Sequence, residues 1–113
     1  MKNFDSLNLK SKEKKGIFLL REKVLNLYPK SELIIFGSKA RGDYNKDSDI
    51  DILILVDEIN NKVESDIHDI VYDIIYKFEI PINETIAEKK LLETAWSVQI
   101  PFYANVIREG AKV

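Results

Sequence analysis

Residues 36–54 of this chain read FGSKARGDYNKDSDIDILI. The apolar ends of this stretch belong to two short, β-branched runs, 32–36 and 49–56, each of which predicts a buried strand. The segment between them, 37–48, is polar and rich in turn-forming residues, so it has room for no more than a short helical turn. Because a parallel pair needs a long crossover, we expect these two strands to be antiparallel.

Asp49 and Asp51 stand at the start of the second strand. Residues two apart on a strand share a face and lie about 6.6–7 Å apart, so the two carboxylates can converge on one or two divalent cations. Mg²⁺ is commonly held by one or two carboxylates together with substrate phosphates, and a two-ion site stabilises both the attacking and the leaving oxygen of a phosphoryl displacement. The alternative is a solvated strand start, which Gly37-Ser38 at a matching distance disfavours.

Gly37-Ser38 follows the first strand directly. Glycine lets backbone N–H groups approach a ligand closely, and a helical turn over 39–42 would make these amides and the Ser38 hydroxyl an anion cradle. Lys39 and Arg41 are candidate phosphate ligands, with two alternatives: both are solvent-facing loop charges, or Arg41 pairs with a loop carboxylate. A phosphate cradle and a metal clamp on neighbouring strands are what transfer of a nucleotidyl group requires.

The remaining pattern completes an α/β (α+β) fold, a small mixed β-sheet flanked by helices, within one domain spanning 1–113. Apolar periodicity and punctuation predict helices at 12–28, 60–78 and 88–95, an edge strand at 80–87, and a last helix from Pro101 to Gly110. Residues 1–10 are polar and are expected to be flexible. His68 is expected on a helix surface. Trp96, Phe102 and Tyr103 are expected to pack on the sheet, with a partner-binding patch as the alternative.

Composition excludes several functions. The 113 residues contain no cysteine and one histidine, which removes disulfides, thiolate chemistry and His-rich metal sites. No apolar run approaches the roughly 20 residues of a membrane span, and the N-terminal residues lack a signal sequence, so we expect a cytoplasmic protein with no membrane contact. A formal charge of −2 gives no basic surface for direct nucleic-acid binding.

The Gly37-Ser38 pair, the ten-residue gap and Asp49-x-Asp51, with Ala40-Arg41-Gly42 inside, resemble the nucleotidyltransferase superfamily that includes DNA polymerase beta. More narrowly, residues 12–110 look like the minimal nucleotidyltransferase (MNT) group, often encoded beside a HEPN-domain toxin. The resemblance implies the polymerase-beta-like fold, with Gly37 and Ser38 binding nucleotide phosphates. It implies that Asp49 and Asp51 are the catalytic metal ligands.

The same resemblance implies an antitoxin of a toxin–antitoxin system. Its activity would be Mg²⁺-dependent transfer of AMP from ATP (AMPylation) to a tyrosine of a HEPN toxin. The alternatives are a catalytically inactive antitoxin that neutralises its partner by binding alone, and transfer to a small molecule such as an aminoglycoside. Small-molecule enzymes usually carry a further C-terminal domain, so we expect the acceptor to come from a partner or a second subunit.

The superfamily usually places a third carboxylate on the next strand, here 80–87. The register suggests Asn83 at that position, with Glu84 one residue later, and a one-residue shift moves a side chain to the other face of the sheet. Either Glu84 is a third metal ligand, or the site contains only two carboxylates. With two, nucleotide binding would persist while catalysis would be slow or lost.

Overall fold

The computed structural model describes residues 1–45, 47–98 and 100–113, without the side chains of 95–98. A five-stranded mixed sheet, ordered β1-β5-β2-β3-β4, runs through the molecule. Its strands are β1 (Lys2–Asn3), β2 (Glu32–Phe36), β3 (Ile50–Val56), β4 (Ile82–Glu88) and β5 (Ala111–Lys112). The helices are the short 3-10 turn η1 (Phe4–Ser6), α1 (Ser11–Leu27), α2 (Ser38–Arg41), α3 (Asn61–Phe78), α4 (Lys89–Val98) and α5 (Pro101–Glu109). The predicted α/β class, with a mixed sheet flanked by helices, is confirmed.

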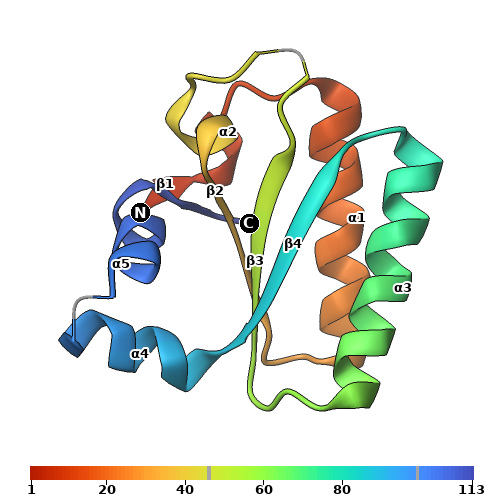
Figure 1. The fold of residues 1–113 in the computed structure, drawn as a ribbon. Coiled ribbons are helices and arrows are strands. Elements are labelled where there is room, and N and C mark those ends of the chain that lie inside the picture. The colour runs from red at the N-terminus through yellow and green to blue at the C-terminus, as the bar shows by residue number, and fades with distance from the viewer. Residues whose placement is uncertain (46, 99) are drawn as a thin grey trace.

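The central strands pair as their connections require. Strand β3 is antiparallel to β2, as predicted, and parallel to β4, to which it is joined through the long helix α3. Strand β4 forms one edge of the sheet, and Pro81 precedes it directly. Proline has no backbone N–H, and at this position no hydrogen bond between strands is lost. Helices α1 and α3 lie side by side, and α4 and α5 lie on the other side of the molecule (Figure 1).

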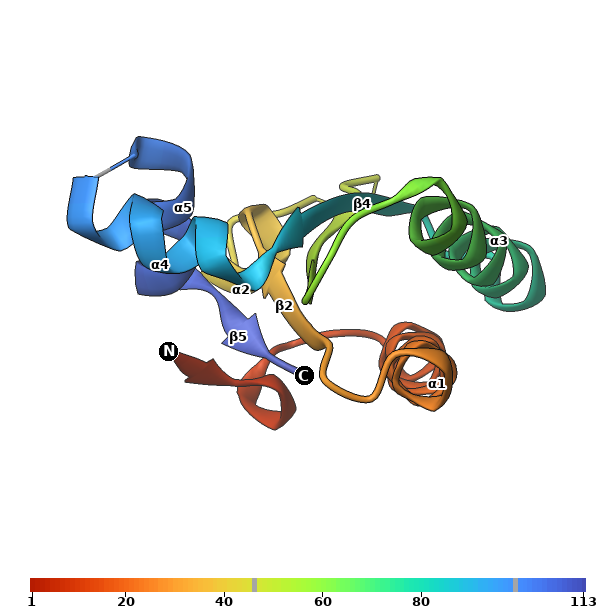
Figure 2. The same ribbon diagram turned by 90° about the horizontal axis from the view of Figure 1, so that it is seen from below.

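Each face of the sheet has its own apolar cluster, because alternate residues of a strand point to opposite faces. The larger cluster lies beneath α1 and α3, where Ile17, Leu20 and Val24 of α1 are fully buried at helical spacing. The smaller cluster lies towards α4 and α5 and consists of Ile34, Leu53, Leu55, Ala87 and Val106. Figure 2 shows the two helix pairs on opposite sides of the sheet.

The N-terminal residues differ from expectation. Residues 1–10 were expected to be flexible, but Lys2–Asn3 pair with β5, and Phe4, Leu7 and Leu9 are buried in the larger cluster. Their apolar side chains follow no helix or strand pattern, and the strand that precedes them pairs with β5, a strand from the far end of the chain. No helix in the described ranges is long and apolar enough to cross a membrane.

Candidate active site

The Gly37 turn and Asp51 lie in direct contact. In the antiparallel register Phe36 pairs with Asp51, so Gly37 leaves β2 beside the Asp51 carboxylate. A Cβ added to Gly37 would clash with Asp51 Oδ2, and the φ of Gly37 is +72°, which disfavours any residue with a side chain. Two constraints therefore favour glycine here, the positive φ and the close approach of the turn to the Asp51 carboxylate.

Helix α2 turns immediately after Gly37. The amides of Ala40 and Arg41 donate to the Gly37 carbonyl at 3.1 and 3.0 Å, so these N–H groups are used within the turn. The preceding amides, of Ser38 and Lys39, occupy the first positions of a helix, where N–H groups have no intrahelical acceptor. The half-buried Ser38, the first residue of α2, therefore has a free backbone donor directly after the Gly37–Asp51 contact.

Asn83, rather than Glu84, lies beside Asp51. Asp51 pairs with Asn83 in the parallel register, and Asn83 Nδ2 donates to Asp51 Oδ1 at 3.1 Å. The amide carbonyl of Asn83 is then available as a further oxygen ligand. Asp49 is exposed and stands one residue before β3.

Of the two alternatives for the third position, the structure favours the one with Asn83 and two carboxylates, and Glu84 as a third metal ligand is corrected. Glu84 pairs in register with Ile52, whose side chain is buried beneath α1 and α3, so Glu84 points to the opposite face from Asp51. There its Oε1 lies 2.5 Å from Nδ1 of His68, a residue on the exposed surface of α3, as predicted for His68. Within the described residues no cluster of three or more His, Cys, Asp or Glu side chains can hold a metal. The hard-oxygen donors at the site are two carboxylates and one amide.

Lys39 lies elsewhere than expected. It was considered as a phosphate ligand or a solvent-facing charge, but its side chain is 2% exposed and its Nζ lies 3.1 Å from Glu13 Oε2 of α1. The ammonium also lies 4.1 Å from the centroid of the Tyr44 ring. The Lys39 side chain therefore links α2 to α1 and is directed to Glu13 rather than to the Gly37 turn. The physical reason is tertiary: the buried Glu13 carboxylate needs a cation, and Lys39 supplies it.

Arg41 follows the loop-carboxylate alternative. Its Nε donates to Asp43 Oδ2 at 3.1 Å and its Nη1 to Glu109 Oε2 at 3.4 Å. The hydrogen bond to Asp43, and then that to Glu109, raise the pKa of the guanidinium above its ordinary value. A pocket next to it is lined by Phe36, Gly37 and Phe102 among others. The Phe102 ring packs edge-on against the Phe36 ring of β2, with ring centroids 5.4 Å apart, as predicted for packing on the sheet. The side chain of Trp96 lies outside the described residues.

Two contributions to the site have only weak signals in the sequence. The Lys2 ammonium donates to the Ala40 carbonyl of α2 at 2.6 Å, and Tyr44 donates its hydroxyl to the Asn8 carbonyl. The N-terminal segment therefore supports the turn that follows Gly37. Glu13 had one available signal: it stands three residues after the N-cap residue Lys10, and its Oε1 accepts from the Lys10 amide at 2.8 Å as in a capping box.

Comparisons with known proteins agree with this geometry. The model of the nucleotidyltransferase domain family matches residues 19–99, and the chain therefore belongs to that family. The protein named "Putative protein adenylyltransferase MJ0604" of Methanocaldococcus jannaschii is 38% identical over 82 residues, which cover 70% of this chain and 73% of that protein. A second protein of that organism, "Putative protein adenylyltransferase MJ0141", is 39% identical over 72 residues, which cover 63% and 72%.

A solved structure shares the fold. The crystal structure of a toxin–antitoxin with AMP-PNP superimposes with a TM-score of 0.55, covering 91% of this chain and 72% of that one at 22% identity. The family, the fold and the named relatives together make this chain a nucleotidyltransferase, consistent with the minimal nucleotidyltransferase group.

Proposed function

We propose that this chain is a Mg²⁺-dependent adenylyltransferase that transfers AMP from ATP to a tyrosine hydroxyl of a HEPN toxin and so acts as its antitoxin. The observation that carries the proposal is the contact between the glycine turn and Asp51, with Asp49 two residues away. Relatives named protein adenylyltransferases, and a fold shared with a toxin–antitoxin structure containing AMP-PNP, support the same activity.

Each residue has a defined part in this reaction. Ser38 and the first amides of α2 bind the β- and γ-phosphates, which approach closely because Gly37 has no side chain. Asp49 and Asp51 would hold Mg²⁺, with the Asn83 carbonyl as a neutral oxygen ligand, since two carboxylates and an amide are the hard oxygen donors that this cation prefers. When bound, Mg²⁺ neutralises triphosphate charge and stabilises the leaving pyrophosphate. Arg41, released from Asp43 and Glu109, would add a further phosphate ligand.

The bonds balance as a simple displacement. The tyrosine oxygen attacks the α-phosphorus, the bond from that phosphorus to the α–β bridging oxygen breaks, and pyrophosphate leaves. The hydroxyl proton passes to solvent, because Asn83 has no basic atom where the family usually has a third carboxylate. The protein contributes positioning and charge neutralisation rather than a covalent intermediate.

Labelled ATP tests the proposal directly. With ATP labelled at the α-phosphate, we expect label on the partner toxin in the presence of Mg²⁺, and a loss of at least about 100-fold with Asp51→Asn, comparable to the loss of an electrostatic catalytic group. Asp73→Asn, an exposed aspartate of α3, is the matched control and should transfer AMP normally. Undiminished transfer by Asp51→Asn would refute the assignment.

A second function is favoured by one observation. Asn83 stands at the position of the usual third carboxylate, and Glu84 is held on the other face by His68. If this arrangement prevents catalysis, the chain is an antitoxin that neutralises its partner by binding alone. Formation of a stable complex with the toxin, without label on either chain, would support this function over the first.

A further inference from the structure

Strand β4 is a long, regular edge of the sheet whose outer side pairs with no other strand. In the described part of the chain it pairs only with β3, through seven consecutive residues without a bulge. No proline or lysine occurs within Ile82–Glu88, although these residues and bulges are the usual means of keeping an edge strand from pairing with another chain. The opposite edge, β1, has only two residues. Of the two edges, β4 is therefore the one that can accept a further strand.

The hydrogen bonds between β3 and β4 define which backbone groups of β4 face outwards. The Ile50 amide donates to the Pro81 carbonyl at 2.8 Å, and in a strand alternate residues bond to the same neighbour. The odd-numbered residues of β4 therefore bond to β3, and the backbone groups of Glu84 and Ile86 point away from it. Neither residue has a backbone hydrogen bond to another element within the described ranges, and both are half-buried. Unpaired backbone groups of native proteins are solvated, so these are open to a second chain.

The face of β4 that carries Asn83 is open from this edge towards Asp51. Asn83 is exposed and contacts Asp51, and Thr85 and Ala87, which share its face, are small. A strand added beside β4 would lie about 4.8 Å from β4 and about 9.6 Å from β3. A tyrosine opposite Asn83 would project over this face, and the length of its side chain would bring the hydroxyl towards Asp51. A serine hydroxyl at the same place would stay close to its own backbone.

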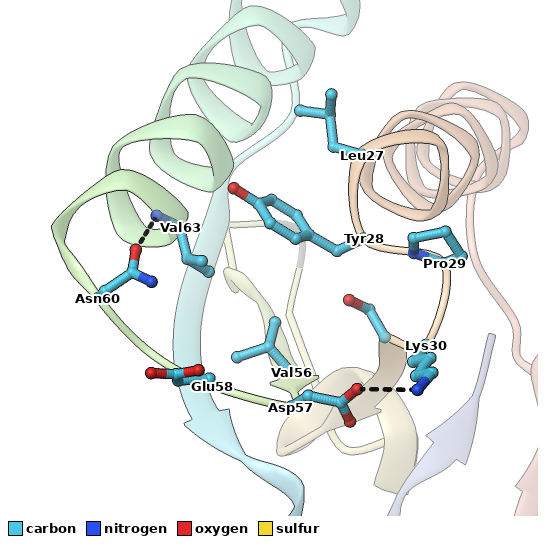
Figure 3. Close-up of a pocket in the computed structure, with 10 residues that line it drawn as sticks. Leu27, Tyr28, Pro29, Lys30, Val56, Asp57, Glu58, Asn60 and Val63 are labelled. Carbon is cyan, nitrogen blue, oxygen red and sulfur yellow. Dashed lines mark hydrogen bonds and ion pairs between the residues drawn. The ribbon is translucent and has the colours of Figure 1, made fainter.

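The other face of β4 borders α3 and carries two carboxylates. Glu84 contacts His68 of α3, and Glu88 Oε2 accepts at 3.0 Å from the backbone amide two residues before α3 begins. The start of α3 is fixed beside them by its cap, in which Asn60 Oδ1 accepts from the Val63 amide at 2.9 Å (Figure 3). Both carboxylates therefore lie along the boundary between the free edge and a well-anchored helix.

Glu64 adds a third acid to this boundary. It is exposed and stands one helical turn before His68, on the same side of α3. Its carboxylate makes no hydrogen bond or ion pair within the described residues. Lys90, 3.5 Å from Glu88, offsets one of the three negative charges. Because acids outnumber cations here, this side of the edge favours basic side chains on an added strand.

We propose that the acceptor of AMP transfer binds as an extended segment that adds to the outer edge of β4, with a tyrosine on the active-site face and basic residues on either side of it. The inference rests on the proposed function, for which it defines the conformation and sequence of the acceptor. Backbone hydrogen bonds to Glu84 and Ile86 hold the segment, and the alternation of its side chains places the tyrosine over Asn83. The transfer is unchanged: the tyrosine oxygen attacks the α-phosphorus, and pyrophosphate leaves.

The synthetic peptide acetyl-KTKYKTK-amide, with its tyrosine and threonines on one face and lysines on the other, tests the proposal. With α-labelled ATP we expect label on the peptide, and saturating peptide should slow hydrogen exchange of the Glu84 and Ile86 amides by about tenfold or more. The peptide with serine in place of tyrosine should slow exchange equally but take no label. Acetyl-ETEYETE-amide should bind more weakly, because like charges then face each other.

Methylation of the peptide backbone distinguishes strand addition from other modes of binding. Only alternate N–H groups of a strand face a given neighbour. Methylation of the alternate set that faces β4 should therefore lower transfer by about 100-fold, through the loss of several hydrogen bonds, and methylation of the other set should leave transfer largely unchanged. Equal effects of the two sets would overturn the proposal.

Variants of the chain provide matched controls. Ile86→Pro removes an outward N–H without breaking a bond to β3, so it should fold and lower transfer to the peptide by about five- to tenfold. Glu64→Lys should lower it by about threefold, the effect of a surface charge. Asp73→Lys should not, because Asp73 is exposed nine residues after Glu64, two and a half turns later and on the opposite side of α3.

Two outcomes separate this proposal from the proposed function. Slower exchange of the Glu84 and Ile86 amides, without label on the peptide or on the toxin, would support strand addition and refute the transferase activity. Label on the toxin, with undiminished transfer by Ile86→Pro and no slowing of exchange by the peptide, would support the activity and show that strand addition is wrong.

Discussion

The two faces of the sheet differ in what they do. Beneath α1 and α3 the strands bury a large, almost entirely apolar cluster, whereas towards α4 and α5 the same strands bury a smaller one and present Asp51 and Asn83 at one end. The difference is clearest at two adjacent residues. Asn83 contacts Asp51, whereas Glu84 points to the face covered by α1 and α3 and pairs with His68. One face therefore buries most of the apolar core, and the other carries the residues of the proposed active site.

This division separates two kinds of charged residue that look alike in the sequence. Lys39 and Asp51 both lie in the stretch of residues 36–54. Lys39 is buried against Glu13 of α1, whereas Asp51 faces the glycine turn. Substitutions on the two faces should therefore separate loss of stability from loss of transfer.

The largest effect is expected at the buried ion pair. Lys39→Met leaves the Glu13 carboxylate buried and unpaired, which should lower the free energy of unfolding by about 3–5 kcal/mol. Lys112→Met, which breaks an exposed pair with Glu32, should cost about 0–1 kcal/mol. Urea denaturation of both variants measures the difference. A double variant, Lys39→Met with Glu13→Leu, should recover part of the loss, and equal stability of the two single variants would contradict the prediction.

The second-largest effect is expected at Gly37, the glycine that contacts Asp51. Gly37→Ala introduces a Cβ that clashes with the Asp51 carboxylate, so AMP transfer should fall by about 100-fold, as when a reacting group is displaced by an ångström. Gly42 is the matched control, because its φ is +89° but nothing lies within 4 Å of an added Cβ. Gly42→Ala should cost about 1 kcal/mol of stability and leave transfer largely intact. Equal losses of transfer in both variants would show that strain alone, and not the Asp51 contact, matters.

Adjacent residues of β4 provide the third test. Asn83→Asp places a third carboxylate next to Asp51, where it can accept the acceptor hydroxyl proton, so the transfer rate should rise by about 10- to 100-fold, at or below the usual range for a general base. Glu84→Gln should leave the rate unchanged, since its side chain faces α3. Initial rates with α-labelled ATP measure both. A slower Asn83→Asp variant would show that the amide is itself required at this position.

The smallest effect concerns the stability of the protein at acidic pH and involves Asp66 of α3. Hydrogen bonds from Lys62, and then from Tyr28, lower the pKa of Asp66. A carboxyl whose pKa is lower in the folded state contributes stability above its unfolded pKa of about 3.9 and loses it as the pH falls through the folded value. The Asp66→Asn variant should therefore lose less stability than the parent protein as the pH falls below 4. Thermal unfolding at several pH values measures the difference. Asp69→Asn, on the same helix, should follow the parent protein.

Most of the secondary structure could be predicted, because it depends on local pattern. The helices at 11–27 and 61–78 begin and end within one residue of expectation, and Pro101 and Gly110 bound the last helix as predicted. Strands β1 and β5 were missed, since each has two residues and forms only by pairing with a distant segment, β1 with β5 and β5 also with β2. Burial of Phe4, Leu7 and Leu9 follows from that meeting.

The candidate site was predictable in type but not in every member. Gly37, Ser38, Asp49 and Asp51 are set by spacing along two strands, which the sequence displays directly. The expected register favoured Asn83 over Glu84, but it could not decide between them, because the pairing of β4 with β3 is long-range and one residue of shift exchanges the two side chains. The destination of Lys39 depends on Glu13, a residue 26 positions away on another element.

The sequence by itself determined the strands, the two long helices and a polar motif with the spacing of a nucleotidyltransferase, because hydrophobic periodicity and turn chemistry act over a few residues. The tertiary structure decided which side chain stands beside Asp51 and which cation pairs with Glu13. Those outcomes depend on which segments meet in space, and one residue of register is enough to exchange the two faces of a strand.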